Sequence, residues 1–377
     1  MNNRAGRLVE VHAKQYKAYA PNPIPSLEEL LIDSEMLELL SEASNTLGVL
    51  DGMAQSIPDM QLFVTAYVRK EALLSSQIEG TQASLVDVLD SAEECVSNMD
   101  VNDVVNYIKG LSYAVEKLRD YPLCNRLLRE IHSILLSGTR GNDKNPGEFR
   151  HSQNWIGGAH CTLNDARYVP PTPENMIECM SDIEKYINYS EDNVLIKAGL
   201  VHYQFETVHP FLDGNGRIGR MLIVLMLMDG NMLSYPILYI SYYLKKNRVE
   251  YYDRLEAVRN TGNYEQWLKF FLRAIIDSTK DTICTIERIN DLKRECDITC
   301  DACNGAQRAL YEYIWKNPII DITKTARELG VSYNTVNTGI KKLVGYNILV
   351  PRDEQQRNRV FCFSRYIDIL KKDTENL

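Results

Sequence analysis

The feature that most constrains this chain is the segment HPFLDGNGRIGR, residues 209–220, which runs without a break into the apolar stretch MLIVLMLM. The apolar stretch is typical of a buried helix. The segment before it contains glycines, an aspartate and two arginines, so it is too polar and too glycine-rich to be core. The chain therefore has to hold charged groups at the start of a buried helix.

Two glycines flank an asparagine at the centre of this segment, at Gly214, Asn215 and Gly216. Glycine allows backbone conformations closed to other residues, so successive N–H groups can point into one concavity. The helix that follows presents unpaired N–H groups and a partial positive charge to the same place. Arg217 and Arg220 share one face of its first turn, where both guanidinium groups can bind phosphate oxygens. Together these features predict a polyphosphate site.

Asp213 and His209 add chemistry to this site. A carboxylate beside a polyphosphate is a usual ligand of Mg²⁺ or Mn²⁺, and a histidine that titrates near neutrality suits a general base. No protein nucleophile is evident, so the pattern indicates direct transfer of a phosphorus group to an external hydroxyl. Two other interpretations stay open. One is a surface loop in which Asp213 caps the helix, and the other is a zinc site of His202, His209 and Asp213.

The segment matches His-Pro-Phe-x-x-Gly-Asn-Gly-Arg-x-x-Arg at every fixed position, and in this it resembles the signature of the Fic family. The resemblance implies a protein adenylyltransferase. Such an enzyme transfers AMP from ATP to a Ser, Thr or Tyr hydroxyl of a target protein, or of itself, and releases pyrophosphate. Family members that act as kinases replace the Gly-Asn-Gly-Arg portion, which is intact here, so the resemblance favours nucleotidyl transfer over phosphotransfer.

The same resemblance implies a role for each motif residue. His209 would deprotonate the acceptor hydroxyl, and Asp213 would hold Mg²⁺ between the α- and β-phosphates of ATP. Residues 214–216 would bind the α- and β-phosphates and stabilise the charge of the transition state. Arg217 would bind the β-phosphate and Arg220 the γ-phosphate.

Three further segments extend the resemblance. NPGEFR, residues 145–150, is similar to the family's Pro-Gly-x-[FY]-Arg segment. LNDARYVPPTP is similar to the hairpin flap that holds a target segment by β-strand pairing. NRVEYYDRL is similar to the stretch that borders the adenine pocket, with Tyr252 and Leu255 as candidates, although Tyr252 would equally suit an ordinary core position. The flap residues implied in target docking are Leu163, Asn164, Asp165 and Ala166.

SSQIEG, residues 75–80, resembles the family's inhibitory motif, [S/T]-x-x-x-E-[G/N]. Ser75 and Glu79 are four residues apart, so on a helix they share a face, and Gly80 is a natural helix stop. The resemblance implies the N-terminally autoinhibited class, in which Glu79 pairs with Arg220 and leaves the α-phosphate of ATP misplaced. A glutamate that merely ends a surface helix is the alternative. Some members with this motif also remove AMP, so a bifunctional enzyme stays open.

The chain as a whole predicts a mainly α protein, with a Fic-fold helical core, a small β-hairpin flap and a C-terminal winged helix-turn-helix. Residues 1–25 are expected to form an extended arm before a cap at Ser26, and helical spacing of apolar residues follows. The expected domains are an N-terminal helical region with the inhibitory helix (1–120), a Fic catalytic core (121–290), a linker (291–304) and the winged helix (305–377).

The C-terminal part has the sequence pattern helix, helix, helix, hairpin. It carries twelve Lys and Arg against eight Asp and Glu, within a chain whose net charge is −9. Ala326 and Gly330 stand where a helix-turn-helix needs small residues, and Ser332 suits the cap of its recognition helix. DNA binding is one interpretation, and contact with a protein partner or a homodimer is the other. The candidate DNA-contacting residues are Asn334, Asn337, Lys341, Lys342, Arg357 and Arg359.

Nine scattered cysteines are typical of reduced thiols, and no secretion signal or membrane span is evident. We therefore expect a cytoplasmic protein with no membrane partner. Cys296, Cys300 and Cys303 have a spacing that also serves iron–sulfur clusters, but their place in the expected linker favours thiols on a solvated connector. The second functional interpretation is a nucleotide-sensing regulatory protein that binds DNA or a partner. Labelling of protein by ATP distinguishes the two.

Overall fold

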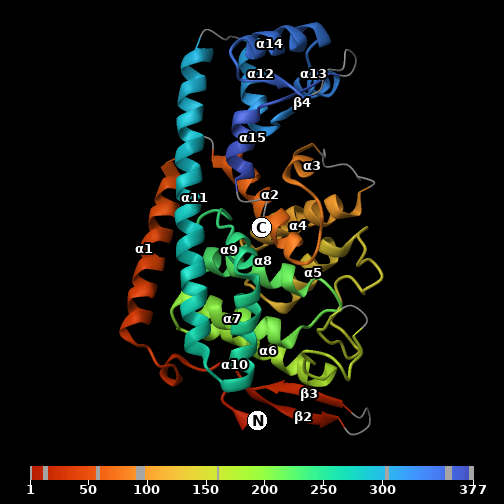
Figure 1. The fold of residues 1–377 in the computed structure, drawn as a ribbon, viewed down its shortest axis with the longest axis vertical. Coiled ribbons are helices and arrows are strands. Elements are labelled where there is room, and N and C mark those ends of the chain that lie inside the picture. The colour runs from red at the N-terminus through yellow and green to blue at the C-terminus, as the bar shows by residue number, and fades with distance from the viewer. Residues whose placement is uncertain are drawn as a thin grey trace.

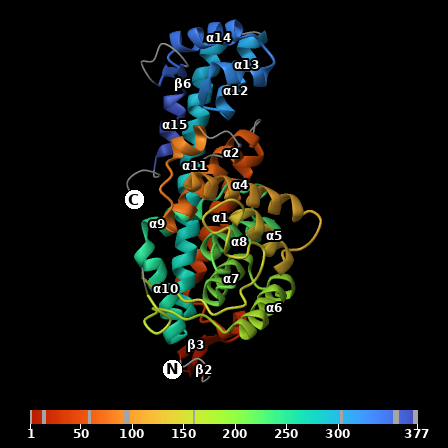
Figure 2. The same ribbon diagram turned by 90° about the vertical axis from the view of Figure 1, so that its right-hand side faces the viewer.

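The computed structural model describes residues 2–11, 16–56, 60–90, 98–158, 161–301, 305–352 and 359–372. Helices make up most of this part of the chain and form an elongated body with a small sheet at each end (Figure 1). The view at right angles shows the same arrangement, with the C-terminal module stacked on the helical core (Figure 2). The mainly α fold is thus confirmed.

The first residues form a three-stranded antiparallel sheet, so the expectation of an extended arm was wrong. Backbone pairing in its hairpin runs from Gly6 opposite Pro21 to Val11 opposite Tyr16. Ala18 is fully buried against the core, so a tertiary contact stabilises a strand that local sequence pattern does not reveal. The strands are β1 (Asn2–Asn3), β2 (Gly6–Val11) and β3 (Tyr16–Pro21), followed by the short 3₁₀ helix η1 (Leu27–Glu29).

Two long helices lie side by side along the left of Figure 1: α1 (Ser34–Ser56) and the 37-residue α11 (Tyr264–Cys300). Next comes α2 (Met60–Ile78), the helix that ends at the expected inhibitory segment. It contacts α4 (Met99–Lys117) and α9 (Ile240–Lys246), and the short α3 (Leu85–Asp90) follows it.

The centre of the protein is α8 (Asn215–Asp229), the apolar helix that follows the polar motif. Its residues from Arg217 to Leu227 are buried, as the sequence predicts for a core helix. Helices that precede the motif in the chain pack against it, which fixes where the motif can point. These neighbours include α5 (Asn125–Leu136) and α7 (Val194–Val208), and the core also contains α6 (Pro173–Tyr189) and α10 (Arg248–Thr261).

The C-terminal module has the predicted order of three helices and a hairpin, with an added short strand and a final helix. Its sheet has the order β4-β6-β5. The assignment of this module as a winged helix-turn-helix stays a prediction. Its elements are α12 (Gly305–Lys316), β4 (Ile319–Asp321), α13 (Ile322–Leu329), α14 (Tyr333–Gly345), β5 (Val350–Pro351), β6 (Val360–Cys362) and α15 (Ser364–Lys371).

The junction between core and module differs from the expected solvated connector. Helix α11 continues through the first part of the expected linker to Cys300, and Cys296 and Cys300 are both buried in it. Cys303 lies outside the described residues. The cysteines therefore pack as small apolar side chains where they are described. The other domain boundaries stay predictions.

The module also rests on the core directly. Helix α12 contacts α2, where Arg69 donates a hydrogen bond to the Lys316 carbonyl (3.5 Å). Arg352, just after β5, forms an ion pair with Asp90 at the end of α3 (2.7 Å). Helix α2 therefore belongs to two interfaces, one with the core and one with the module.

The chain between α5 and α6 contains little regular structure. The predicted flap hairpin is present as one antiparallel pair, Ile156 opposite Tyr168, with backbone N···O distances of 2.8 and 3.1 Å. Residues 159–160 lie outside the described residues. Among the described helices, none is long and apolar enough to cross a membrane.

Candidate active site

The polar motif forms a tight turn between α7 and α8. His209 ends α7 with a left-handed backbone (φ 50°), and Gly214 precedes α8 with φ 76°. The Asn215 side chain closes the turn: its amide donates to the Phe211 carbonyl, and its oxygen accepts from the Phe211 N–H, both at 2.8 Å. Asn215 is therefore a brace of the loop, and the backbone N–H groups at the start of α8 are left for an anion.

His132 of α5 supports this turn from behind. Its Nδ1 accepts from the Gly147 N–H (2.9 Å), so its Nε2 carries the proton and donates to the Asp213 carbonyl (3.1 Å). Burial lowers the pKa of His132 to about 4, which keeps the ring neutral. The ring stacks on Phe211 with centroids 3.8 Å apart.

Arg150, the arginine of the NPGEFR segment, is a second support. It is fully buried, and its guanidinium donates to the carbonyls of His209 (3.0 Å), Val208 (3.4 Å), Pro171 (2.5 Å) and Ser152 (3.3 Å). Burial lowers its pKa to about 10, so it stays charged at neutral pH. A cation that binds only backbone carbonyls fixes the path of the chain around His209 rather than contacting a ligand.

His209 reaches the cavity described below as a neutral imidazole. Burial lowers the pKa of His209 to about 4, although the Glu79 carboxylate acts to raise it. A neutral imidazole at pH 7 can accept a proton, so its protonation state is the one that a general base needs.

Glu79 lies over the start of α8 and binds Arg220. The Arg220 Nη2 donates to Glu79 Oε1 (2.8 Å) and to the Ser75 carbonyl (2.9 Å), while its Nε donates to Ser75 Oγ (2.9 Å). A Cβ added at Gly216 would meet Glu79 Oε1 at 2.1 Å, so only glycine admits the carboxylate there. Burial acts to raise the pKa of Glu79, but Arg220 and Arg217 hold it below its ordinary value. The carboxylate therefore occupies the place where an anion would bind.

Arg217 is bound to two carboxylates. Its guanidinium is 3.0 Å from Asp103 Oδ1 of α4 and 3.3 Å from Asp213 Oδ1. The side chains of Arg217 and Asp103 are 6% and 12% exposed, so this is a largely buried pair. Asp213 is more open, with 42% of its side chain exposed. Its oxygen also accepts from the N–H of Gly214, the residue just before α8 (2.5 Å).

The donor set at Asp213 fits a metal ion that arrives with a nucleotide. Among the described residues, no cluster of three or more His, Cys, Asp and Glu side chains could hold a metal by itself. Mg²⁺ is commonly held by one or two carboxylates plus substrate phosphates, and the half-exposed Asp213 carboxylate offers one such ligand. The alternative zinc site lacks support, because His202 Nε2 and Nδ1 are engaged by Tyr251 Oη and the Gly219 carbonyl, each at 2.9 Å.

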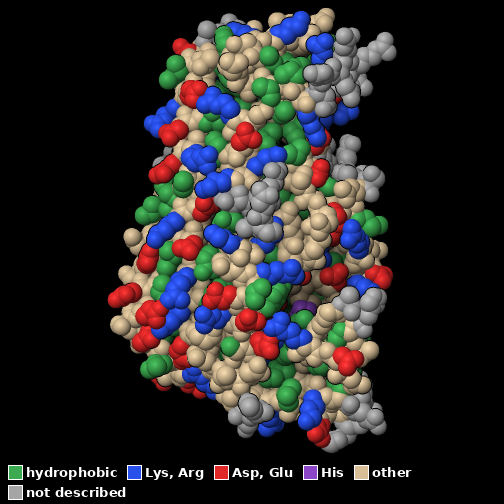
Figure 3. All heavy atoms as spheres, in the orientation of Figure 1, with side chains coloured by type: hydrophobic (Ala, Val, Ile, Leu, Met, Phe, Trp, Pro, Cys, Tyr) green, Lys and Arg blue, Asp and Glu red, His purple; other side chains and the backbone are tan. Residues whose placement is uncertain are grey.

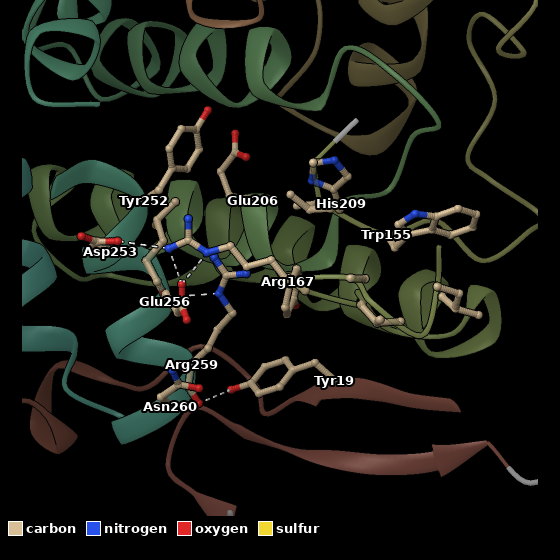
Figure 4. A pocket seen from close by; sticks show the side chains of 18 of the residues that line it. Tyr19, Trp155, Arg167, Glu206, His209, Tyr252, Asp253, Glu256, Arg259 and Asn260 are labelled. Carbon is tan, nitrogen blue, oxygen red and sulfur yellow. Dashed lines mark hydrogen bonds and ion pairs between the residues drawn. The ribbon is translucent and has the colours of Figure 1, made fainter. Parts of the chain in front are cut away.

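A cavity of about 1390 Å³ opens beside this turn (Figure 4). His209 and Gly216 line it, and so do Glu79, both adenine-pocket candidates (Tyr252 and Leu255) and three flap candidates (Leu163, Asn164 and Ala166). The fourth flap candidate, Asp165, accepts a hydrogen bond from Thr162 Oγ1 within the flap (2.7 Å). Asp213, Arg217 and Arg220 are not among the lining residues in this closed arrangement.

Ion pairs join the flap to the far wall of the cavity. Arg167 binds Glu256 (2.5 Å) and Asp253 (3.1 Å) of α10, the helix that also carries Tyr252 (Figure 4). All three side chains are between 41% and 60% exposed, so the contact is a solvated one. We call this contact the Arg167 clasp.

The N-terminal sheet forms another wall, which sequence reasoning missed. The Tyr19 N–H of β3 donates to the Val169 carbonyl (2.9 Å), so β3 pairs with the chain that leaves the flap. Leu8, Tyr16 and Lys17 of the same sheet line the cavity.

A surface view of the molecule shows acidic and basic side chains intermixed over one whole face, with a histidine visible in a recess (Figure 3).

Four side chains that shape this site were not predicted: Asp103, His132, Arg150 and Glu206. Each is buried in the structure. The available signal was the same for Asp103, His132 and Glu206, a single charged or polar residue within an apolar helical stretch, which needs a partner when buried. Such a pattern indicates that the residue needs a hydrogen-bond or ion-pair partner, but it does not identify that partner.

Comparison with known proteins matches residues 122–227 to the Fic/DOC family and residues 37–116 to the N-terminal domain of that family. The protein adenylyltransferase Fic of Culex quinquefasciatus is 34% identical over 160 residues, which is 41% of this chain and 27% of that protein. The Aedes aegypti protein of the same name is 35% identical over 140 residues, 36% of this chain and 24% of that protein. The chain therefore aligns with about a quarter of the length of these relatives.

A solved structure has the same fold over nearly the whole chain. The crystal structure of a Fic family protein from Desulfovibrio desulfuricans G20 superposes with a TM-score of 0.58 at 17% identity, covering 91% of this chain and 98% of that one. At this identity the likeness is one of fold alone.

Proposed function

Because residues 122–227 form a Fic/DOC family domain, we propose that the chain is an autoinhibited protein adenylyltransferase. It transfers AMP from ATP to a Ser, Thr or Tyr hydroxyl of a target protein, and to itself, with release of pyrophosphate. The observation that carries the proposal is a neutral imidazole, His209, held beside the helix start where Gly216 leaves room for an anion.

The proposed reaction uses the turn between α7 and α8 as a phosphate site. The triphosphate binds the N–H groups at the start of α8, with Arg217 on the β-phosphate and Arg220 on the γ-phosphate. Asp213 is the ligand for Mg²⁺ or Mn²⁺, which would neutralise phosphate charge when bound. Backbone N–H groups of residues 214–216 stabilise the charge that builds up on the α-phosphate oxygens.

His209 supplies the proton chemistry. Its imidazole takes the proton of the acceptor hydroxyl, and the hydroxyl oxygen forms a bond to the α-phosphorus. The bond from the α-phosphorus to the bridging oxygen breaks, and pyrophosphate leaves with that electron pair. The buried Arg150 and the half-buried Asn154 hold the carbonyl of His209 (3.0 and 3.1 Å), so the base has a fixed position for this step.

Two features support the docking of an extended target segment beside His209. Leu163, Asn164 and Ala166 line the cavity that His209 also lines, and a flap edge with unpaired backbone groups can accept a strand. Tyr252 and Leu255 of α10 line the opposite side and suit the adenine ring. The Tyr252 ring contacts Tyr251 with centroids 4.9 Å apart, so it offers an aromatic surface at the cavity wall.

Autoinhibition is the second part of the proposal. Glu79 and Ser75 engage Arg220, the residue assigned to the γ-phosphate, and the Glu79 carboxylate lies on Gly216. ATP that binds with Glu79 in place would be displaced from in-line geometry. The charge-assisted hydrogen bond between Glu79 and Arg220 is worth roughly 1.5–3 kcal/mol, which is large enough to hold the closed state and small enough to be reversed.

The test is incubation of the purified chain with labelled ATP and Mg²⁺, alone and with a cell lysate, followed by intact-mass measurement. The proposal expects an added AMP on the chain or labelled lysate bands, strongest with Glu79→Gly and absent with His209→Ala. Bound nucleotide without any labelled protein in all variants would favour the second candidate, a nucleotide sensor. Loss of AMP from labelled protein on further incubation would show a bifunctional enzyme.

The second candidate draws on the C-terminal module. Asn334 and Lys341 of α14 are exposed, and Ser332 caps that helix by accepting from the Thr335 N–H (3.2 Å). Asn337 and Lys342 are half-buried, and Arg357 lies outside the described residues while Arg359 is exposed. A DNA-binding module would show an affinity that falls steeply with salt, whereas a salt-independent or absent gel shift would favour contact with a protein partner or a homodimer.

A further inference from the structure

Glu206 is a buried acid that the proposed reaction does not use. It lies in the last turn of α7, three residues before His209, and lines the same cavity as His209, Glu79 and Gly216 (Figure 4). The residue is 7% exposed, and its Oε1 atom has no hydrogen-bond partner among the described residues. A buried carboxylate is unfavourable unless it is neutral or faces a cation, so this side chain needs an explanation.

The arginine that acts most strongly to lower the pKa of Glu206 belongs to α8. The Oε1 atom of Glu206 rests on the backbone of α8 at Gly219, where an added Cβ would come within 2.5 Å. Gly219 is followed directly by Arg220, which is 1% exposed. Glu206 and Glu79 both act to raise the pKa of Arg220, against the effect of its burial, so two carboxylates serve one buried arginine.

Other charged or titratable groups also face Glu206 from the elements packed around it. Burial raises the pKa of Glu206 to about 7; Arg220 and Arg259 act against that rise, and Glu79 adds to it. The groups are Glu79 beyond α2, His202 and His209 in α7, Arg220 in α8, and Tyr251, Tyr252 and Arg259 in α10. Glu206 is therefore poised between its two protonation states while Glu79 is in place.

Release of Glu79 would leave Arg220 as a buried cation without its ion pair, which is strongly unfavourable. We propose that Glu206 is the second counter-ion of Arg220: it binds the arginine when Glu79 leaves, and it releases the arginine and takes up a proton from solvent when a nucleotide phosphate arrives. The inference rests on the proposed nucleotide site. Glu206 is a positioning residue in this scheme, because it acts on the substrate only through Arg220.

The direction of the pH effect follows from the charges. Removal of Glu79 removes a repulsion, so the pKa of Glu206 falls below about 7 and the side chain ionises at neutral pH. The phosphate charge then raises the pKa again, so nucleotide binding takes up a proton. A ligand that raises a pKa binds more tightly at low pH, and its affinity falls as the pH rises from the free-state to the bound-state value of that pKa.

The first test is calorimetric binding of ATP with Mg²⁺ to the full chain carrying Glu79→Gly and His209→Ala, which prevents turnover. Titrations between about pH 6 and pH 8, in two buffers of different ionisation enthalpy, measure the proton uptake. We expect an uptake approaching about one proton, and its loss on adding Glu206→Gln. Protons that ATP itself takes up or releases contribute equally in both chains, so they cancel in the comparison. Equal uptake with and without Glu206, or no uptake in either, would overturn the inference.

The second test does not depend on a binding measurement. Thermal unfolding of the unchanged chain, Glu79→Gly, Glu206→Gln and the double variant forms a double-mutant cycle. We expect the double variant to lose more stability than the sum of the single changes, because Arg220 then has no carboxylate. Adding Arg220→Met should cancel that excess loss. ATP should raise the melting temperature of the double variant more than that of the other chains. Additive melting temperatures would contradict the inference even if each variant folds poorly.

These outcomes are separable from the proposed function. Transfer of AMP by the Glu79→Gly chain, combined with proton uptake that is insensitive to Glu206, would leave the adenylyltransferase proposal standing and remove the role of Glu206. Proton uptake that depends on Glu206 in a chain that labels no protein would do the reverse.

Discussion

Glu79 Oε1 lies 2.8 Å from the Nη2 atom of Arg220, although the two residues are 141 positions apart in the chain. The arginine side chain is 1% exposed and the glutamate side chain 38% exposed, so the pair joins the core to the cavity. The Glu79 carboxylate thereby covers the start of α8 and binds Arg220 at the same time. The following predictions depend on that arrangement and on the residues that hold it.

Replacing Glu79 with glycine should raise AMP transfer strongly. The change frees Arg220 and opens the space above Gly216, and displacement of a reacting group by about 1 Å can cost about a hundredfold in rate. Incorporation of AMP from labelled ATP measures the effect. Glu79→Gln, which keeps the shape and removes the charge, should give an intermediate rate. Equal incorporation by all three chains would rule out the inhibitory role.

Ser75→Ala should release inhibition only in part. Ser75 Oγ accepts from the Nε of Arg220 (2.9 Å), but the Ser75 carbonyl and Glu79 still hold the other nitrogen. The lost hydrogen bond is worth roughly 0.5–1.5 kcal/mol, or up to about tenfold in the closed-to-open ratio. The ratio of transfer rates for Ser75→Ala and Glu79→Gly measures it, and Ser76→Ala is the matched control on the same helix. A rate for Ser75→Ala as high as that for Glu79→Gly would contradict this prediction.

The pH dependence of transfer should show a base that is neutral across the physiological range. Burial lowers the pKa of His209 to about 4, and Glu79 acts to raise it. A general base works when deprotonated, so its contribution is lost as the pH falls through that value. Transfer by the Glu79→Gly chain should therefore show no loss of base function near pH 6.5, the ordinary pKa of histidine. A midpoint of the transfer rate near pH 6.5 that disappears when His209 is replaced by a different base would contradict the low pKa assigned to His209.

Arg150→Ala should destabilise the protein and slow transfer together. Four backbone carbonyls lose a buried donor, at a cost of about 1–3 kcal/mol for each group left unsatisfied. Denaturant unfolding measures the loss of stability. Arg126→Ala is the control, because its side chain is 79% exposed and should change stability by less than about 0.5 kcal/mol. Arg150→Lys should rescue poorly, because one ammonium cannot reproduce the planar set of donors.

Loss of the Arg167 clasp should act on the target more than on ATP. Arg167→Ala removes the ion pairs that join the flap to α10, so the KM for a protein target should rise while ATP affinity changes little. Solvated pairs are each worth at most about 1 kcal/mol, so one pair accounts for about fivefold and the two together for at most about thirtyfold. The exchanged pair Arg167→Glu with Glu256→Arg should recover part of the loss. Failure of the exchange together with weaker ATP binding would assign Arg167 to the nucleotide instead.

The sequence was informative where one segment carries several constraints at once. The glycine turn, the buried helix after it and the pairing of Glu79 with Arg220 all follow from local spacing plus the resemblance to a known family. Their positions in the structure agree with these expectations, while the roles remain proposals. The expected role of Asn215 changed in detail, because its side chain is used within the loop.

The sequence was least informative where a residue's role depends on a distant partner. Asp103 and Arg217 are 114 positions apart, and the Tyr19 N–H likewise finds its acceptor far along the chain, at the Val169 carbonyl. Strand β3 is also in contact with α7, and its Ala18 is fully buried, so distant parts of the chain contribute to the surroundings of the β2–β3 hairpin. Local pattern can identify a buried charge or a short strand, but only the folded chain supplies its partner.

Helix α2 contacts two parts of the molecule: the core near Ser75, and the C-terminal module through Arg69 and α12. Because a helix is stiff, a displacement of one end of α2 would move the other end as well. A partner that displaces α12 would therefore act on the same helix that ends one residue before Glu79. Cutting the chain after residue 304 would remove the contact that α12 makes with α2, so the helix that leads to Glu79 would be held from one side only.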